Sequence, residues 1–77
     1  MSKMYMRDLT NGQETLIVEA PSRTECWRET WEYLKEKFPS IVSHANEPIL
    51  SRHWFEDDGS EICDFGSWGY WLKYVER

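Results

Sequence analysis

The feature that most constrains the fold is one helix with a clear beginning and a clear end. Ser22 and Glu25 have the spacing of a capping box, in which the serine hydroxyl accepts a hydrogen bond from a backbone amide of the first turn. Pro39 ends the pattern, because proline cannot continue a helix. We therefore predict a single helix over about residues 23–38, with β-rich stretches before and after it.

This helix is amphipathic, so it needs a second layer to cover its apolar side. Large apolar residues recur every three or four positions and predict a stripe that packs on a sheet: Trp27, Trp31, Leu34 and Phe38, widened by Cys26, with Tyr33 at the margin. Charged residues occupy the solvated side: Arg28, Glu29, Glu32, Lys35 and Glu36.

Residues 3–20 read as a β-hairpin that turns at Asn11-Gly12. A two-residue loop would mix polar and apolar side chains on both faces. A three-residue loop, from Thr10 to a left-handed Gly12, separates them better. It would place Met6 opposite Leu16, Met4 opposite Val18, and Lys3 opposite Glu19, and we prefer this register.

The second half of the chain predicts three more strands. Residues 49–56 and 61–65 flank the turn Asp57-Asp58-Gly59-Ser60, and residues 68–75 are rich in aromatic and β-branched side chains. The last segment also fits a short helix, but we favour a strand. In the connection before them, Ile41 and Val42 are expected to tuck beneath the sheet. The prediction is one α+β domain, residues 1–77, in the order ββαβββ, with an antiparallel sheet and one helix on one face.

The charge of the chain argues against a nucleic-acid partner. The 77 residues carry a formal net charge of −5, whereas phosphate binding depends on clustered Lys and Arg. The sequence has no run of 18 apolar residues and no apolar leader, so we expect a cytoplasmic protein with no membrane association.

The acidic side chains near the second turn lack the spacing of a calcium loop, and we expect them to be solvated: Glu56, Asp57, Asp58, Glu61 and Asp64. The candidate zinc ligands are scattered without a paired motif: His44, His53, Cys26 and Cys63. Both cysteines are expected to be buried thiols, and a Cys–His nucleophile pair would lack an orienting group. We therefore predict no metal, no cofactor and no catalysis.

Aromatic residues make up 16% of the chain, with five Trp, four Tyr and three Phe, which is more than a small core holds. If Tyr70 and Leu72 face the helix, Trp71 shares the other face of the sheet with Lys73 and Val75. Tyr5 and Ile17 would lie beside it if their strands are neighbours. We predict a partner-binding surface formed by Tyr5, Trp54, Asp57, Asp58, Trp68 and Trp71.

These residues favour a non-catalytic protein-binding module. Aromatic anchors would fill a partner's pockets, and the acidic turn would meet a basic patch. If the partner is a nucleic-acid enzyme, the carboxylates of this turn would stand in for phosphates. In general character the chain is similar to small accessory proteins of bacteriophages and mobile elements, a likeness that implies steric inhibition of a host enzyme. Three alternatives remain open: a structural homo-oligomer using the same face, a single-stranded RNA-binding sheet, and rings that only fill the core.

Overall fold

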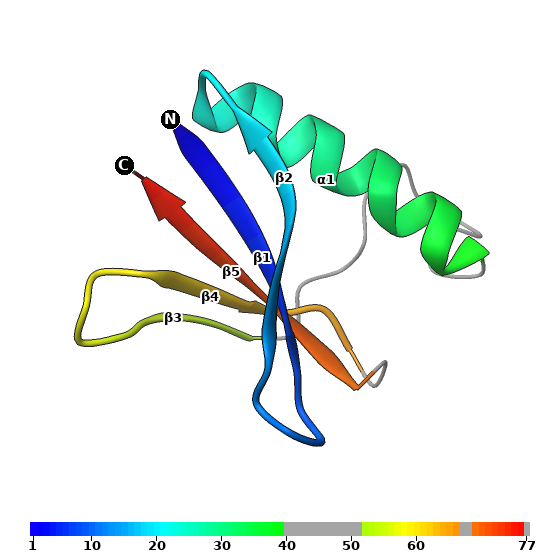
Figure 1. The fold of residues 1–77 in the computed structure, drawn as a ribbon, viewed down its shortest axis with the longest axis vertical. Helices are drawn as coiled ribbons and strands as arrows, with labels where there is room; N and C mark the ends of the chain where they lie inside the picture. The colour runs from blue at the N-terminus through cyan, green and yellow to red at the C-terminus, as the bar shows by residue number, and fades with distance from the viewer. Residues whose placement is uncertain (40–51, 67–68, 77) are drawn as a thin grey trace.

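The computed structural model describes residues 1–39, 52–66 and 69–76. Within these residues there are five strands and one helix, in the predicted order ββαβββ, so the predicted α+β class is confirmed (Figure 1). The elements are β1 (Ser2–Asp8), β2 (Glu14–Ala20), α1 (Arg23–Lys37), β3 (Arg52–Phe55), β4 (Glu61–Asp64) and β5 (Tyr70–Glu76). The predictions for Ile41, Val42 and Trp68 fall outside the described residues.

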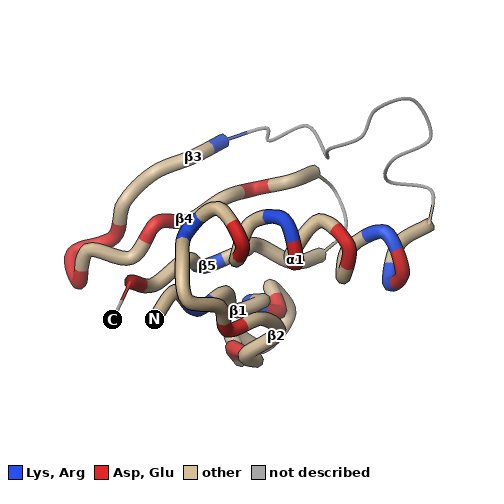
Figure 2. The backbone as a smooth tube through the Cα atoms, turned by 90° about the horizontal axis from the view of Figure 1, so that it is seen from above, with Lys and Arg blue, Asp and Glu red and all other residues tan. Residues whose placement is uncertain are grey.

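The strands form one antiparallel sheet in the order β2-β1-β5-β4-β3. The last segment is therefore a strand and not a helix, and it lies in the centre, where it pairs with β1 on one side and β4 on the other. The helix packs on β1 and β2. The β3–β4 hairpin extends away from it, as Figures 1 and 2 both show.

The helix begins where the capping box predicted. The Ser22 hydroxyl oxygen accepts a hydrogen bond of 3.2 Å from the Glu25 backbone amide. At the other end Phe38 is the cap residue, and its backbone N–H donates to the Leu34 carbonyl at 2.8 Å. The observed bounds thus agree with the prediction to within one residue, which is the usual uncertainty of a helix end.

The buried line of the helix runs through Cys26, Thr30 and Leu34. The predicted tryptophans Trp27 and Trp31 pack against the core, but they are only partly buried. Small residues at the centre of the line let the helix approach the sheet, whereas indole rings fit only at its flank. Thr30 is tolerated there because its hydroxyl donates to the Cys26 carbonyl at 2.7 Å.

The turn of the first hairpin is one residue longer than predicted. The Asp8 backbone amide donates to the Gln13 carbonyl at 2.8 Å, so the loop runs from Leu9 to Gly12. The Asp8 carboxylate accepts hydrogen bonds from the backbone N–H and hydroxyl of Thr10, and this local capping holds the longer loop. The three-residue loop was therefore wrong, but Gly12 is left-handed as predicted, with φ +74°.

A β-bulge at Ile17 restores the predicted strand pairing in the part of the hairpin further from the turn. Tyr5 pairs with Leu16, and the next pair is Met4 with Val18, so Ile17 is the extra residue. The predicted Met4–Val18 and Lys3–Glu19 pairs are confirmed. The predicted pairing of Leu16 with Met6 is wrong, because between the bulge and the turn the strands are offset by one residue.

The bulge also changes which β2 side chains face the helix. Ile17 and Val18 both pack against the core, whereas Leu16 lies on the other face, opposite Tyr5. The expectation that Ile17 lies beside Trp71 was therefore wrong, and Leu16 takes that face instead. A bulge sends two consecutive side chains to one side, which the alternation of a regular strand does not allow.

The core between helix and sheet is centred on Met4, Leu34, Cys63 and Leu72, each with no exposed surface. Cys26 is also fully buried, and both cysteines are free thiols, as predicted.

Leu34→Ala removes the only fully buried leucine of α1, and we expect it to lower the free energy of unfolding by about 2–5 kcal/mol because it leaves a cavity. Denaturant unfolding followed by tryptophan fluorescence measures the loss. Glu36→Ala on the exposed side is the matched control and should change stability by less than about 0.5 kcal/mol. Equal effects of the two changes would show that α1 does not pack as described.

Candidate functional site

The face of the sheet opposite α1, here called the open face, carries three of the six predicted partner-binding residues: Tyr5, Trp54 and Trp71. Strand alternation places its side chains in register across all five strands: Lys3, Tyr5 and Arg7 of β1, Glu14, Leu16 and Glu19 of β2, Arg52 and Trp54 of β3, Ile62 and Asp64 of β4, and Trp71, Lys73 and Val75 of β5. Among the described residues no helix lies over this face. It is therefore the candidate site.

Towards its β3 edge, this face carries a cluster formed by Trp54, Trp71 and Arg52, here called the aromatic cluster. The two indole rings meet edge to face, with centroids 4.8 Å apart and planes at 88°. The Arg52 guanidinium lies 5.2 Å from the Trp54 ring and 5.6 Å from the Trp71 ring, and its Nε donates to Asp64 at 3.1 Å. Edge-to-face rings and a cation–π contact fix these side chains in place.

A buried apolar residue, Ile62, lies next to the cluster on the same face of the sheet. Ile62 pairs with Trp54 on one side and with Lys73 on the other, and it has no exposed surface. Both tryptophans are half-buried, so each presents only part of its ring to solvent. The sequence predicted that Trp54 and Trp71 are site residues, and the structure brings them into contact.

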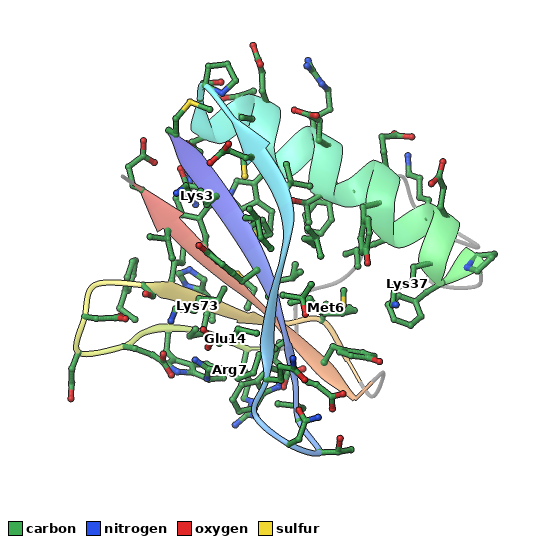
Figure 3. All side chains as sticks on the ribbon, in the orientation of Figure 1. Lys3, Met6, Arg7, Glu14, Lys37 and Lys73 are labelled. Carbon is green, nitrogen blue, oxygen red and sulfur yellow. The ribbon has the colours of Figure 1, made fainter. Side chains whose placement is uncertain are left out.

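Beside the cluster lies a network of ion pairs around Arg7. Its guanidinium makes two hydrogen bonds to Glu56, of 2.9 and 3.0 Å, and a third to Glu14 of 2.9 Å. Lys73 links to Glu14 at 3.2 Å and to Asp58 at 3.7 Å. Figure 3 shows Arg7, Glu14 and Lys73 grouped where β1, β2 and β5 run together.

The network keeps its carboxylates ionised. The hydrogen bonds from Arg7 lower the pKa of Glu56 below its ordinary value. Burial by itself would raise the pKa of Glu14, but hydrogen bonds from Arg7 and Lys73 outweigh it, and the pKa of Glu14 is lowered. The pKa of Arg7 is raised, chiefly by Glu56. The open face is thus a fixed pattern of charges around apolar rings.

The two predicted acidic residues of the β3–β4 turn differ from each other. Acidic positions gather at this turn in Figure 2. Hydrogen bonds from the Ser60 side chain and from the Ser60 backbone amide, the latter of 2.9 Å, lower the pKa of the Asp58 carboxyl group. This carboxylate also lies 3.7 Å from Lys73 Nζ. Asp57 is exposed, and the structure records no ion pair for it within the described residues. Asp57 is therefore the more available of the two.

Leu16 is a surface residue that the sequence did not predict. It lies beside the predicted Tyr5, is 47% exposed, and is the most exposed large aliphatic residue of the strands. The regular alternation assigned it to the core, and only the bulge turns it outward. No signal in the sequence marks that bulge.

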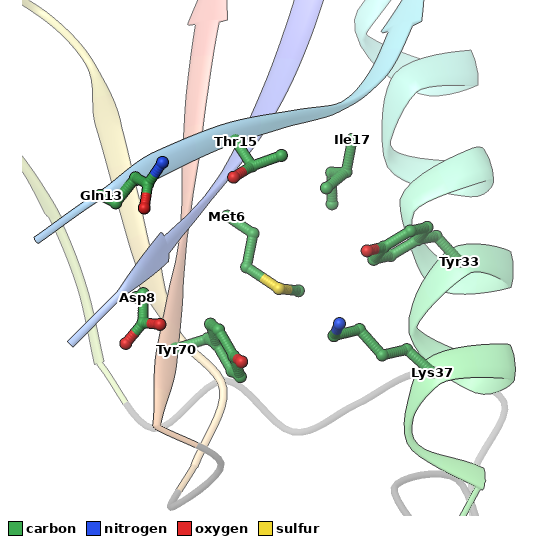
Figure 4. Close-up of a pocket in the computed structure, with 8 residues that line it drawn as sticks. All are labelled: Met6, Asp8, Gln13, Thr15, Ile17, Tyr33, Lys37 and Tyr70. Atoms are coloured by element: carbon green, nitrogen blue, oxygen red, sulfur yellow. The ribbon is translucent and has the colours of Figure 1, made fainter. Parts of the chain in front are cut away.

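A small hollow opens on the helix side, between α1 and strands β1, β2 and β5 (Figure 4). Its volume is about 190 Å³, and its lining includes Met6, Asp8, Ile17, Tyr33, Lys37 and Tyr70. Ligand pockets usually enclose about 300–1,000 Å³. The lining also lacks a nucleophile beside a general base, and the Asp8 carboxylate is engaged by Thr10. This hollow fits a few water molecules better than a substrate.

The cysteines are also poorly placed for nucleophilic chemistry. Burial raises the pKa of the Cys63 thiol to about 12 and raises that of Cys26 as well. At neutral pH both groups are therefore protonated, whereas the thiolate is the nucleophile.

Comparison with known proteins adds no function. No protein-family model, no curated protein sequence and no solved structure matches this chain. In the part of the chain that the structure describes, no helix has the length and apolar character needed to cross a bilayer. A functional hypothesis therefore rests on the geometry of the described residues.

Arg7→Gln should lower the free energy of unfolding by about 1 kcal/mol at pH 7, because it removes the cation that Glu56 and Glu14 share. The lowered pKa values of both carboxyl groups mean that this stabilisation is present above their unfolded pKa of about 4.3. It is lost as the pH falls through the folded values.

The difference between wild type and variant should therefore shrink below about pH 4 in denaturant titrations. Arg28→Gln on the exposed side of α1 is the matched control and should show no such pH-dependent difference. A difference for Arg7→Gln that stays constant from pH 7 to pH 3 would show that Arg7 acts by packing alone.

Proposed function

We propose that this chain is a non-catalytic protein-binding module whose open face contacts the partner. The observation that carries the proposal is the Trp54–Trp71–Arg52 cluster, with rings 4.8 Å apart, set on the buried Ile62. Trp, Tyr and Arg are the residue types that dominate binding energy at protein interfaces. Because these side chains are already held in place, binding would cost little further side-chain entropy.

The charges of the open face favour a protein over a nucleic acid. Each cation there already has a carboxylate partner: Lys3 with Glu19, Arg7 with Glu14 and Glu56, Arg52 with Asp64, and Lys73 with Glu14 and Asp58. Phosphates would have to compete with these carboxylates. The exposed Asp57 at the rim instead favours a basic patch on the partner.

The same charges disfavour self-association. Two copies would each contribute a formal charge of −5, and joining their open faces would add like charges at the rims. The partner we propose is therefore a different protein, with an apolar surface that contacts Leu16 and the aromatic cluster, and with basic residues around it. Binding of this kind would act by covering a surface, as steric inhibitors do.

Affinity capture with paired variants tests the proposal. Leu16→Glu and Trp71→Ala alter the open face, whereas Phe55→Ser removes an apolar side chain that is 66% exposed on the helix side of the sheet. A partner of the open face should bind the Phe55→Ser variant as it binds wild type. Its affinity for the two open-face variants should fall by about 10-fold or more, as at interface hot spots.

Thermal melting shows whether each variant is folded, and Leu16→Glu is informative because its side chain is already exposed. Equal capture by all three variants would refute the open face as the binding surface. Sedimentation over a range of protein concentrations tests the homo-oligomer, and a concentration-dependent mass that Leu16→Glu abolishes would favour it. Tryptophan quenching by single-stranded RNA at low salt would favour the nucleic-acid alternative.

A further inference from the structure

Three side chains of different chemistry converge on the helix side of the β3–β4 hairpin. His53 pairs directly across from Cys63, and Glu61 points to the same face because it lies two residues before Cys63. The imidazole nitrogen, carboxylate oxygen and sulfur atoms all lie within 4.8 Å of one another. Glu61 and Cys63 are buried, whereas the His53 side chain is 43% exposed.

Nitrogen, oxygen and sulfur donors of this kind form zinc sites. In a tetrahedral site each donor lies about 2.0–2.3 Å from the ion, so two donors lie about 3.3–3.7 Å apart. His53 Nε2 and Glu61 Oε2 are joined by a hydrogen bond of 2.7 Å, with a proton between them. An ion that replaced this proton would need the two atoms to separate by less than about 1 Å.

Arg23 is the existing cationic partner of Glu61, so its role decides whether an ion can bind. Its guanidinium donates to both carboxylate oxygens, at 2.8 and 2.9 Å. The Arg23 side chain is 51% exposed, so it can keep Oε1 and release Oε2 to an ion. It would then orient the carboxylate from outside, as hydrogen-bonded partners do in many metal sites.

The protonation states set the cost of binding. Hydrogen bonds from Arg23 lower the pKa of Glu61, so this ligand is already ionised. Burial raises the pKa of Cys63 to about 12, but a coordinated metal ion removes the thiol proton. Of the three ligands, His53 has the side chain that is most exposed to solvent.

We propose that His53, Glu61 and Cys63 form a binding site for a zinc-class divalent cation, with a fourth position open to water. The sequence could not predict this set, because its ligands follow no paired motif and come together only by strand register. The site lies on the opposite face of the sheet from the proposed partner surface. Either proposal can therefore fail without the other.

Titration of the full chain with Co²⁺ tests the site, because a cobalt–thiolate bond gives an absorption band in the near ultraviolet. We expect this band in wild type and in Cys26→Ala, the matched control, and its loss in Cys63→Ser. His53→Ala should weaken Co²⁺ affinity more than the roughly 10–100-fold that loss of an outer partner causes.

Thermal melting with Zn²⁺ gives a second readout. Zn²⁺ should raise the melting temperature of wild type, because the ion binds the folded chain, and it should raise that of His53→Ala much less. His53→Ala alters a partly exposed side chain and keeps the buried residues. The absence of a thiolate band in wild type, or an equal effect of Zn²⁺ on wild type and His53→Ala, would overturn the proposal.

Discussion

The pairing of β1 with β5 is the interaction on which the rest of the structure depends. It joins the two ends of the chain in the middle of the sheet, with Ser2 opposite Glu76. In this register Met4 and Tyr74 face the helix, whereas Tyr5 and Lys73 face the other side. A slip by one residue would exchange the two faces, so the core and the open face are set by the same pairing.

The two faces of the sheet differ in their side chains and in what packs against them. On the helix side, apolar side chains fill the space beneath α1, and small residues let it approach. On the open face, partly buried rings lie among charged side chains that neutralise one another. The rings are therefore packed by their neighbours but keep part of their surface exposed, and this is the surface that we propose contacts a partner. The β3–β4 hairpin contributes to both faces, through Trp54 on one and His53 on the other.

Most of the secondary structure could be predicted from local patterns, whereas the order of the strands in the sheet could not. Ser22 and Glu25 located the helix start, Asn11-Gly12 located the first turn, and aromatic alternation identified β5. The loop length and the register of the first hairpin could not be predicted, because side chains near the turn form local hydrogen bonds that lengthen the loop. Asp8 forms hydrogen bonds within a four-residue loop, and this loop shifts the strand pairing by one residue. The bulge at Ile17 then restores the predicted pairing of Met4 with Val18.

The sequence by itself determined the secondary structure elements, the acidic charge and the candidate residues Tyr5, Trp54 and Trp71. Their signals lie within a few neighbouring residues or in composition. Only the tertiary structure decided that Trp54 meets Trp71, that Leu16 faces outward, and that Glu61 lies between Arg23 and His53. These contacts join strands that are distant in the chain, and they depend on strand order and register, which no local pattern encodes.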